Sequence, residues 1–372
     1  MHDPRLSRMA EILVKYSTKI KAGDKVKITG QPVSIPLLEQ IYIEALKAGG
    51  HPFVDISLPS INQYFYKYAN EKQLAFVSPI AKTLINNYDV SINIMSEENV
   101  HRLSGVDPKK QAMRSVAMKK LGALQMKRMA SGEARTCIAL FPTNAYASTA
   151  EMSLEDFEDF VFSACYVNHK NPLKKWKEVK DHQDKVIKFL SKFSKIRVVA
   201  PGTDISFSYK NRGWMNCDGQ LNFPDGEVFT CPVENSANGT VKFTYPACFN
   251  GREVENVELT FEKGVVTKAT ASKNQEFLTE MLNTDKGARK LGEFAIGTNK
   301  GVNRFTKNIL FDEKIAGTVH FAVGLSAPGC GGKNKSSIHW DMVCDLRKDG
   351  KIYADDKLFY KNGKFIDKKL QN

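Results

Sequence analysis

The sequence predicts an α/β N-terminal domain, in which helices cover a mostly parallel sheet, followed by a β-rich α+β C-terminal domain. Two observations predict this arrangement. Helical and strand-like patterns alternate over residues 1–195, which is typical of parallel sheets with helical crossovers. From residue 196 onward, strand patterns become frequent and are separated by turns rich in Gly, Asn and Asp, which is typical of antiparallel hairpins. We therefore place the two domains at 1–195 and 196–372.

In the first domain, apolar residues recur at three- and four-residue steps in the helical segments and alternate in the strands. Pro36 lies at a first-turn position of its helix, Gly49-Gly50 ends that helix, and Ser153 is a good N-cap before an acidic first turn. The expected helices are 5–17, 36–48, 60–68, one beginning at 153 and 173–192; the expected strands are 25–29, 53–56, 89–95 and 136–141.

In the second domain, strict alternation predicts strands around Ile205–Tyr209, Val241–Tyr245 and Val257–Phe261. One helix is expected at Asn274–Asn283. The lysine-rich segment after Asp345 predicts closing strands with a turn at residues 348–350.

The composition is that of a globular protein rather than a membrane or disordered one, with 42% hydrophobic and 26% charged residues. The sequence contains no run of eighteen apolar residues, so we expect no membrane-spanning helix. Met1–Arg5 lacks the apolar centre of a signal peptide. The seven cysteines are scattered, odd in number and without a CxxC motif. This pattern predicts free thiols in a reducing cytoplasm.

The formal net charge is +13, which raises the question of nucleic-acid binding. The lysines are spread along the chain, and many alternate with acids. The two denser clusters, 109–128 and 347–369, lack the interleaved aromatics or glycines of an RNA-binding module. We therefore expect a solvated basic surface and no nucleic-acid partner. The first domain contains neither a GxGxxG nor a GxxxxGK[ST] loop, so we do not expect it to bind a nucleotide.

The segment Ser336–Val343 contains the clearest candidate site. On a strand, residues two apart point to the same face, so His339 and Asp341 would project together while Trp340 and Met342 point into the core. An imidazole beside a carboxylate forms half of a metal site. A single His-x-Asp pair is also typical of a core histidine that is salt-bridged to its neighbour.

Three further short stretches place an acid or a histidine near a strand end or a turn. A set of histidines and carboxylates without cysteine suits zinc, cobalt or manganese, and so many ligands suit two ions about 3.5–4 Å apart, which generate a hydroxide near neutral pH and polarise a carbonyl. Each acid alone could equally be a surface carboxylate, and Glu313 more so because Asp312 and Lys314 flank it. The candidate metal ligands are Glu227, Glu293, Glu313, His320, His339 and Asp341.

The sequence resembles the aminopeptidase T / aminopeptidase S family of dinuclear metallo-aminopeptidases along almost the whole chain. The resemblance is carried by the segments 26–50, 152–160, 224–230 (PDGEVFT), 292–294 (GEF), 310–314 (LFDEK) and 332–342 (GKNKSSIHWDM). It implies Glu227, Glu293, His320, His339 and Asp341 as metal ligands, with Glu313 as a further ligand or general base. It also implies a homodimer that removes N-terminal residues from peptides with two ions of zinc, cobalt or manganese per chain.

One position departs from the family pattern. The family usually has a tyrosine seven residues after the first histidine, and here that position is Ala327. A phenol there could stabilise the oxyanion of a tetrahedral intermediate, and losing one such donor can cost about 10²–10³ in rate.

The leading hypothesis is therefore a metallo-aminopeptidase in which a metal-bridged hydroxide attacks the scissile carbonyl and Glu293 or Glu313 moves the proton. The alternative is a metal-binding relative with weak or no peptidase activity, which acts as a binding or structural protein.

Overall fold

The computed structural model describes residues 3–249 and 251–371, and the chain divides into two compact units. The first unit is formed by residues 1–173 together with 219–224, and the second by residues 174–218 and 225–372. The sequence alone predicts a boundary at 195. Helix α9 (Pro172–Leu190) lies almost entirely in the second unit, and residues 219–224 return to the first.

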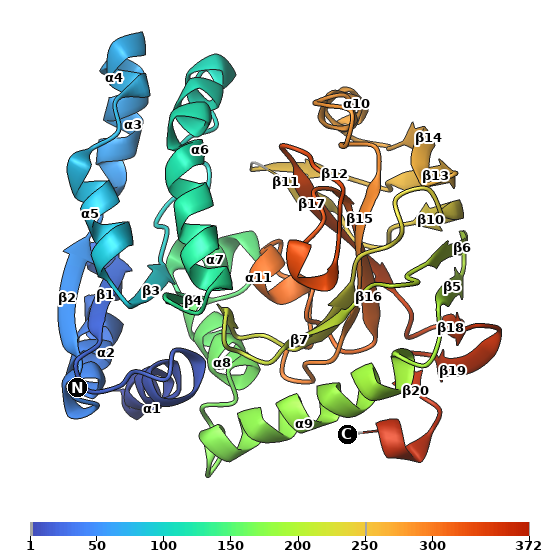
Figure 1. Cartoon of the computed structure of the whole chain (residues 1–372), viewed down its shortest axis with the longest axis horizontal. Coiled ribbons are helices and arrows are strands. Elements are labelled where there is room, and N and C mark those ends of the chain that lie inside the picture. The colour runs from blue at the N-terminus through green and yellow to red at the C-terminus, as the bar shows by residue number, and fades with distance from the viewer. Residues whose placement is uncertain (1–2, 250, 372) are drawn as a thin grey trace. The chain divides into compact units, whose positions relative to one another are not determined.

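The first unit contains a five-stranded sheet in the order β2-β1-β3-β4-β8, and every neighbouring pair is parallel. This confirms the predicted parallel sheet. Strands β1 to β4 of this sheet are labelled in Figure 1. Alternating burial of Val26 and Ile28 against Lys25 and Lys27 reflects the two faces of β1. The strands are β1 (Lys25–Gly30), β2 (His51–Ile56), β3 (Val90–Met95), β4 (Arg135–Leu140) and β8 (Asn222–Phe223).

The predicted helices of the first unit are present, and Ser153 caps α8 by accepting a hydrogen bond from the Asp156 N–H at 3.1 Å. Helix α6 was not predicted as a helix. It coincides with the basic cluster 109–128 and buries only Leu121, so periodicity gave no signal. The helices are α1 (Pro4–Ile12), which continues as the π-helical turn Leu13–Ser17, α2 (Ile35–Lys47), α3 (Pro59–Tyr68), α4 (Glu71–Ala75), α5 (Pro79–Asn87), α6 (Pro108–Ala130), α7 (Asn144–Thr149) and α8 (Leu154–Ala164).

The second unit contains two larger antiparallel sheets and one hairpin, as the turn-rich sequence predicted. The eight-stranded sheet has the order β14-β13-β10-β6-β5-β18-β19-β20, and the five-stranded sheet has the order β17-β16-β15-β9-β7. The strands are β5 (Lys195–Ala200), β6 (Thr203–Ser208), β7 (Trp214–Cys217), β9 (Glu227–Thr230), β10 (Asn238–Lys242), β11 (Ala247–Phe249), β12 (Arg252–Val254), β13 (Glu258–Glu262), β14 (Val265–Thr270), β15 (Leu291–Gly297), β16 (Thr318–Gly324), β17 (His339–Asp345), β18 (Lys351–Ala354), β19 (Lys357–Lys361) and β20 (Lys364–Phe365). The helices are α9, α10 (Gln275–Leu282) and the short α11 (Ile309–Asp312).

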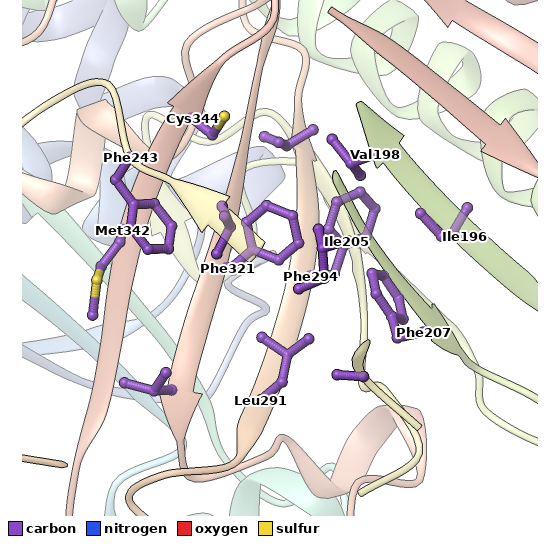
Figure 2. Close-up of a cluster of buried hydrophobic side chains, with 14 of the residues drawn as sticks. Ile196, Val198, Ile205, Phe207, Phe243, Leu291, Phe294, Phe321, Met342 and Cys344 are labelled. Carbon is purple, nitrogen blue, oxygen red and sulfur yellow. The ribbon is translucent and has the colours of Figure 1, made fainter. Parts of the chain in front are cut away.

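The hydrophobic core of the second unit lies between the two larger sheets (Figure 2). Phe207 of β6 contacts Phe294 of β15 with ring centroids 5.1 Å apart, and Phe294 contacts Phe321 of β16 at 5.2 Å. Val186 and Leu190 of α9 join the same cluster. Because this core covers one face of the five-stranded sheet, the other face is left for polar groups.

The prediction that all cysteines are free thiols is wrong for one pair. Cys231 and Cys330 form a disulfide with a Cα–Cα distance of 6.1 Å, although they are 99 residues apart in sequence. Cys231 follows β9 and Cys330 lies in the loop after β16, so the fold brings together two positions that sequence spacing does not relate. The other five cysteines are not disulfide-bonded.

Helices that are both long and apolar enough to cross a membrane are absent from the described residues.

Candidate metal centre

In the five-stranded sheet of the second unit, successive residues of each strand lie on opposite faces, so apolar and polar side chains are separated. Phe294, Phe321 and Trp340 enter the core, whereas their sequence neighbours Glu293 and His320 lie on the other face. The predicted projection of His339 and Asp341 from one strand follows the same rule, because both flank the buried Trp340.

The register of the strands gathers these polar residues into one cluster. Glu293, Ala322 and Asp341 form one row across β15, β16 and β17. Small residues leave room between the longer side chains: Ala322 separates Glu293 from Asp341, Ala295 pairs with His320, and Gly297 pairs with Glu227.

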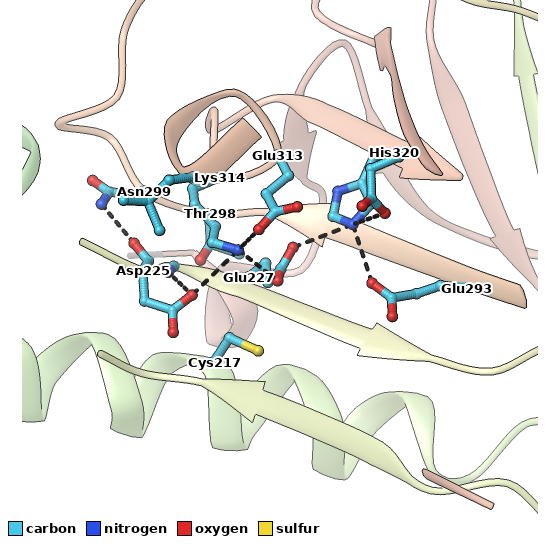
Figure 3. A network of polar contacts seen from close by, with 12 residues as sticks. Cys217, Asp225, Glu227, Glu293, Thr298, Asn299, Glu313, Lys314 and His320 are labelled. Atoms are coloured by element: carbon cyan, nitrogen blue, oxygen red, sulfur yellow. Dashed lines mark hydrogen bonds and ion pairs between the residues drawn. The ribbon is translucent and has the colours of Figure 1, made fainter. Parts of the chain in front are cut away.

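His320 lies at the centre of the cluster and is fully buried. Its Nε2 atom lies 3.3 Å from Glu293 Oε1 and 3.4 Å from Glu227 Oε2 (Figure 3). The same atom lies 3.8 Å from Asp341 Oδ1. One imidazole nitrogen thus faces oxygens from three strands.

His339 is oriented by its backbone surroundings. Its Nδ1 atom donates a hydrogen bond to the Leu325 carbonyl at 2.8 Å, which fixes the ring and leaves Nε2 toward the cluster. That Nε2 atom lies 3.3 Å from Asp341 Oδ1 and 3.9 Å from Glu293 Oε2.

Glu313 reaches the cluster from the turn after α11, and its neighbours are not the surface residues that the sequence suggested. Lys314 is 0% exposed and Asp312 is 2% exposed. Asp312 accepts hydrogen bonds from the Thr306 N–H and hydroxyl at 2.7 and 2.9 Å. Lys314 donates to Glu227 Oε1 at 2.8 Å and also to Glu313.

These contacts define two sets of potential metal ligands that share one residue. Glu293, His339 and Asp341 each offer a ligand atom within 4.8 Å of the others, and so do Glu313, His320 and Asp341. Asp341 belongs to both sets. The structure therefore brings together all six residues that the sequence singled out, with Glu227 beside His320.

Burial and charge perturb the titration of this cluster. Desolvation raises the pKa of Glu227 to about 8. Burial opposes the charge on His320, but the surrounding carboxylates, Glu227 first, raise its pKa to about 9. Asp341 raises the pKa of His339 to about 11, and the two histidines lower the pKa of Asp341 against the effect of burial. Without a metal ion, protons on the imidazoles thus offset carboxylate charge.

The chemistry of the cluster fits divalent cations. Two ligand atoms about 2.0–2.2 Å from one tetrahedrally coordinated ion are roughly 3.4 Å apart, close to the shorter nitrogen–oxygen separations here. Among the described side chains, Glu227 Oε2, His320 Nδ1 and Asp341 Oδ1 are buried without a hydrogen-bond partner. Unpartnered buried oxygens beside imidazoles are the groups that a cation would satisfy.

Comparison with known sequences decides the family. Residues 2–365 match the thermophilic metalloprotease (M29) family. The chain belongs to this family. Membership confirms the predicted resemblance and the enzyme class, a metallopeptidase of the aminopeptidase T and S type, and implies a divalent metal cofactor.

Several aminopeptidases resemble this family member over most of their length. Aminopeptidase 2 of Geobacillus stearothermophilus is 26% identical over 94% of both chains, and Aminopeptidase T of Thermus aquaticus is 24% identical over 91% of both. The solved structure of wild-type AmpT from Thermus thermophilus superposes with a TM-score of 0.84 at 20% identity and covers 98% of this chain and 99% of its own.

The fold alone does not decide the chemistry. The structure of 2,5-dihydroxypyridine dioxygenase from Pseudomonas putida KT2440 superposes with a TM-score of 0.57 at 15% identity, covering 98% of each chain. The same architecture can therefore carry another activity, because the residues of the site and not the fold determine the chemistry.

Two groups that support the cluster, Gln183 and Lys314, were not predicted from the sequence. Gln183 of α9 is fully buried, and its amide donates to the Glu227 carbonyl at 3.0 Å, which fixes the start of β9. Its carbonyl oxygen accepts from the Thr298 hydroxyl at 2.9 Å. The sequence signal for Gln183 is its position on the apolar face of the amphipathic helix α9, where a polar residue needs buried partners. The sequence also shows Lys314 as the cation next to Glu313, but it does not show that this lysine is buried.

Proposed function

We propose that this chain is a metal-dependent aminopeptidase that holds two divalent ions and hydrolyses the N-terminal peptide bond of peptides. The observation that carries the proposal is the pair of three-residue ligand sets that share Asp341. A carboxylate common to two sets is the arrangement expected of a two-ion hydrolytic centre. Ligands of nitrogen and oxygen without a thiolate suit zinc, cobalt or manganese.

When bound, the ions would supply a hydroxide near neutral pH and polarise the scissile carbonyl. The residues of this chain would hold and orient the reactants. Glu227, Glu293, His320, His339 and Asp341 are the proposed ligands. Beside His320, Glu227 would serve as the ligand in place of Glu313, because Glu227 Oε2 lies 3.4 Å from His320 Nε2. Glu313 is then left for another role in the second set. A carboxylate of the same cluster would bind the free α-amine of the substrate, which explains selection for peptide N-termini.

Glu313 suits the role of general base better than Glu293. Both Glu293 oxygens face imidazoles, Oε1 toward His320 and Oε2 toward His339, which favours a ligand role. Among the described residues, no Glu313 oxygen lies within 4.0 Å of an imidazole nitrogen. Lys314 holds the Glu313 Oε1 atom, and the second Glu313 oxygen can accept a proton. We propose that Glu313 moves the proton from water to the leaving amine.

Turnover of leucyl p-nitroanilide by the cobalt-, zinc- or manganese-loaded protein tests the proposal. The matched control is N-acetyl-leucyl p-nitroanilide, which keeps the scissile bond and removes the free amine. We expect cleavage of the first compound only. Equal cleavage of both compounds would contradict an aminopeptidase, and cleavage of neither would favour the non-catalytic relative.

Ala327 is the observation that favours weak activity. It begins the turn Pro328–Cys330 after β16, two residues beyond the Leu325 carbonyl that orients His339. Its methyl group offers no hydrogen-bond donor to an oxyanion. We therefore propose a slow peptidase, with a metal-binding protein of little activity as the second candidate.

The homodimer remains part of the proposal and rests on the family resemblance. The cytoplasmic location also remains a proposal, and it rests on the scattered cysteines, of which only Cys231 and Cys330 form a disulfide. The native mass from analytical ultracentrifugation would test the dimer directly.

A further inference from the structure

A third group of potential ligands lies next to the proposed centre. Cys217 at the end of β7, Asp225 before β9 and Glu227 at the start of β9 each offer an atom within 4.8 Å of the others. A thiol with two carboxylates is a donor set that zinc or cobalt accepts. By residue type alone, this group is as good a metal site as the other two.

The ammonium of Lys314 fills this third group (Figure 3). Its Nζ atom lies 2.8 Å from Glu227 Oε1 and 3.6 Å from Asp225 Oδ1, and it also contacts Glu313. The side chain is 0% exposed. An ammonium has three N–H donors and no acceptor, so it can serve three carboxylates at once, and such pairing is what a buried charge requires.

The backbone holds Lys314 in this position. Its N–H donates to the Phe311 carbonyl at 2.9 Å, and its carbonyl accepts from the Asn299 N–H at 3.0 Å. Gly297 lets the segment approach β15, because a Cβ atom at Gly297 would lie 2.2 Å from the Ile315 carbonyl oxygen. The lysine therefore projects from a segment that is fixed on both sides.

Glu227 connects the lysine to the metal centre. Lys314 takes its Oε1 atom, whereas Oε2 lies 3.4 Å from His320 Nε2 and has no hydrogen-bond partner among the described residues. The lysine thus holds one oxygen of Glu227, and only the other oxygen lies beside His320.

We propose that Lys314 is a positioning residue that acts as a built-in cation: it occupies the group formed by Cys217, Asp225 and Glu227, excludes a metal ion from it and limits Glu227 to one oxygen toward the centre. The proposal rests on the two-ion centre of the proposed function. It predicts that the ammonium can be replaced by a metal ion once the lysine is removed.

Cobalt loading of the full chain tests this proposal through metal content and absorption rather than through activity. Lys314→Met removes the charge and keeps most of the volume. Lys273→Met is the matched control, because Lys273 pairs with Glu255 at 2.7 Å on the exposed surface of the same unit. We expect Lys314→Met to bind one more equivalent of cobalt than the wild type, with a new sulfur-to-cobalt charge-transfer band in the near ultraviolet. The band should vanish in Lys314→Met/Cys217→Ala, and Lys273→Met should match the wild type.

A folded Lys314→Met with unchanged metal content and no sulfur band would overturn the proposal. If that variant does not fold, the wild type decides: it should show no sulfur band, and Cys217→Ala should keep the wild-type metal content. A sulfur band in the wild type, or an equivalent lost in Cys217→Ala, would mean that a metal and not Lys314 fills the group. A wild type without bound cobalt would contradict the two-ion centre, while the band in Lys314→Met would still support the lysine's role.

Discussion

His339 and Asp341 both project from β17, but they contribute differently to the proposed centre. His339 belongs to one ligand set, whereas Asp341 belongs to both. We expect His339→Ala to lose about one equivalent of metal and Asp341→Ala to lose more than one. His101→Ala, which changes an exposed histidine in the first unit, should lose none. Elemental analysis of the dialysed proteins measures this, and full metal content in both β17 variants would show that they are not ligands.

The role of Ala327 is tested by supplying the missing phenol. If a tyrosine at this position stabilises the tetrahedral oxyanion, Ala327→Tyr should raise kcat by up to about 10²-fold with little change in KM, because the group acts only in the transition state. Ala327→Phe is the matched control without the hydroxyl. Steady-state kinetics on leucyl p-nitroanilide compare the three proteins, and a wild type that is already fast and is slowed by tyrosine would refute the interpretation.

Two residues of this chain could in principle replace that phenol, and the structure separates them. The Tyr245 hydroxyl donates to Asp345 at 3.1 Å and accepts from Arg347 at 2.6 Å, so it is bound at the other end of β17 from His339. Ser326 is 1% exposed, and its hydroxyl has no hydrogen-bond partner among the described residues. The kcat of Ser326→Ala therefore distinguishes two roles of this serine. A lower kcat would mean that its hydroxyl replaces the missing phenol, and an unchanged kcat would mean that it only packs.

At the level of elements, the turn that carries Glu313 and Lys314 depends on close backbone approach to β15. Gly297→Ala would place a Cβ 2.2 Å from the Ile315 carbonyl oxygen, so the backbone must move. We expect a loss of about 1–3 kcal/mol in the free energy of unfolding of the second unit, together with reduced metal content.

The control for that substitution is Gly122→Ala in the middle of α6, where a Cβ meets nothing within 4 Å. Replacing an interior helix glycine should stabilise the first unit by about 0.5–1 kcal/mol. Denaturant unfolding of both variants checks the pair. Equal effects of the two substitutions would show that the close approach at Gly297 is not a constraint.

The elements that sequence predicted best are those with a clear period. Strands β1, β3, β6 and β13 alternate buried residues with partly buried or exposed ones, and Ser153 caps the start of α8, so local chemistry determined these elements. Helix α6 has almost no buried face, which removed the signal. The Cys231–Cys330 disulfide depends on the meeting of two loops, which no local pattern encodes.

For the whole molecule, sequence motifs named the six candidate ligands, but only the fold shows how they are grouped. The sharing of Asp341 follows from its row with Glu293 and from its distance to His320, both of which require the sheet register. Lys314 was misjudged because burial of a lysine cannot be inferred from its neighbours Glu313 and Asp312; it results from packing against β9 and β15.

The central claim is a two-ion centre, and metal stoichiometry tests it most directly. The full chain should be dialysed against manganese or zinc, freed of loosely bound ions and analysed for metal per chain. We predict about two equivalents, and about two fewer when both His320→Ala and Asp341→Ala are introduced. A wild type that consistently holds no metal after exposure to these ions would contradict the account.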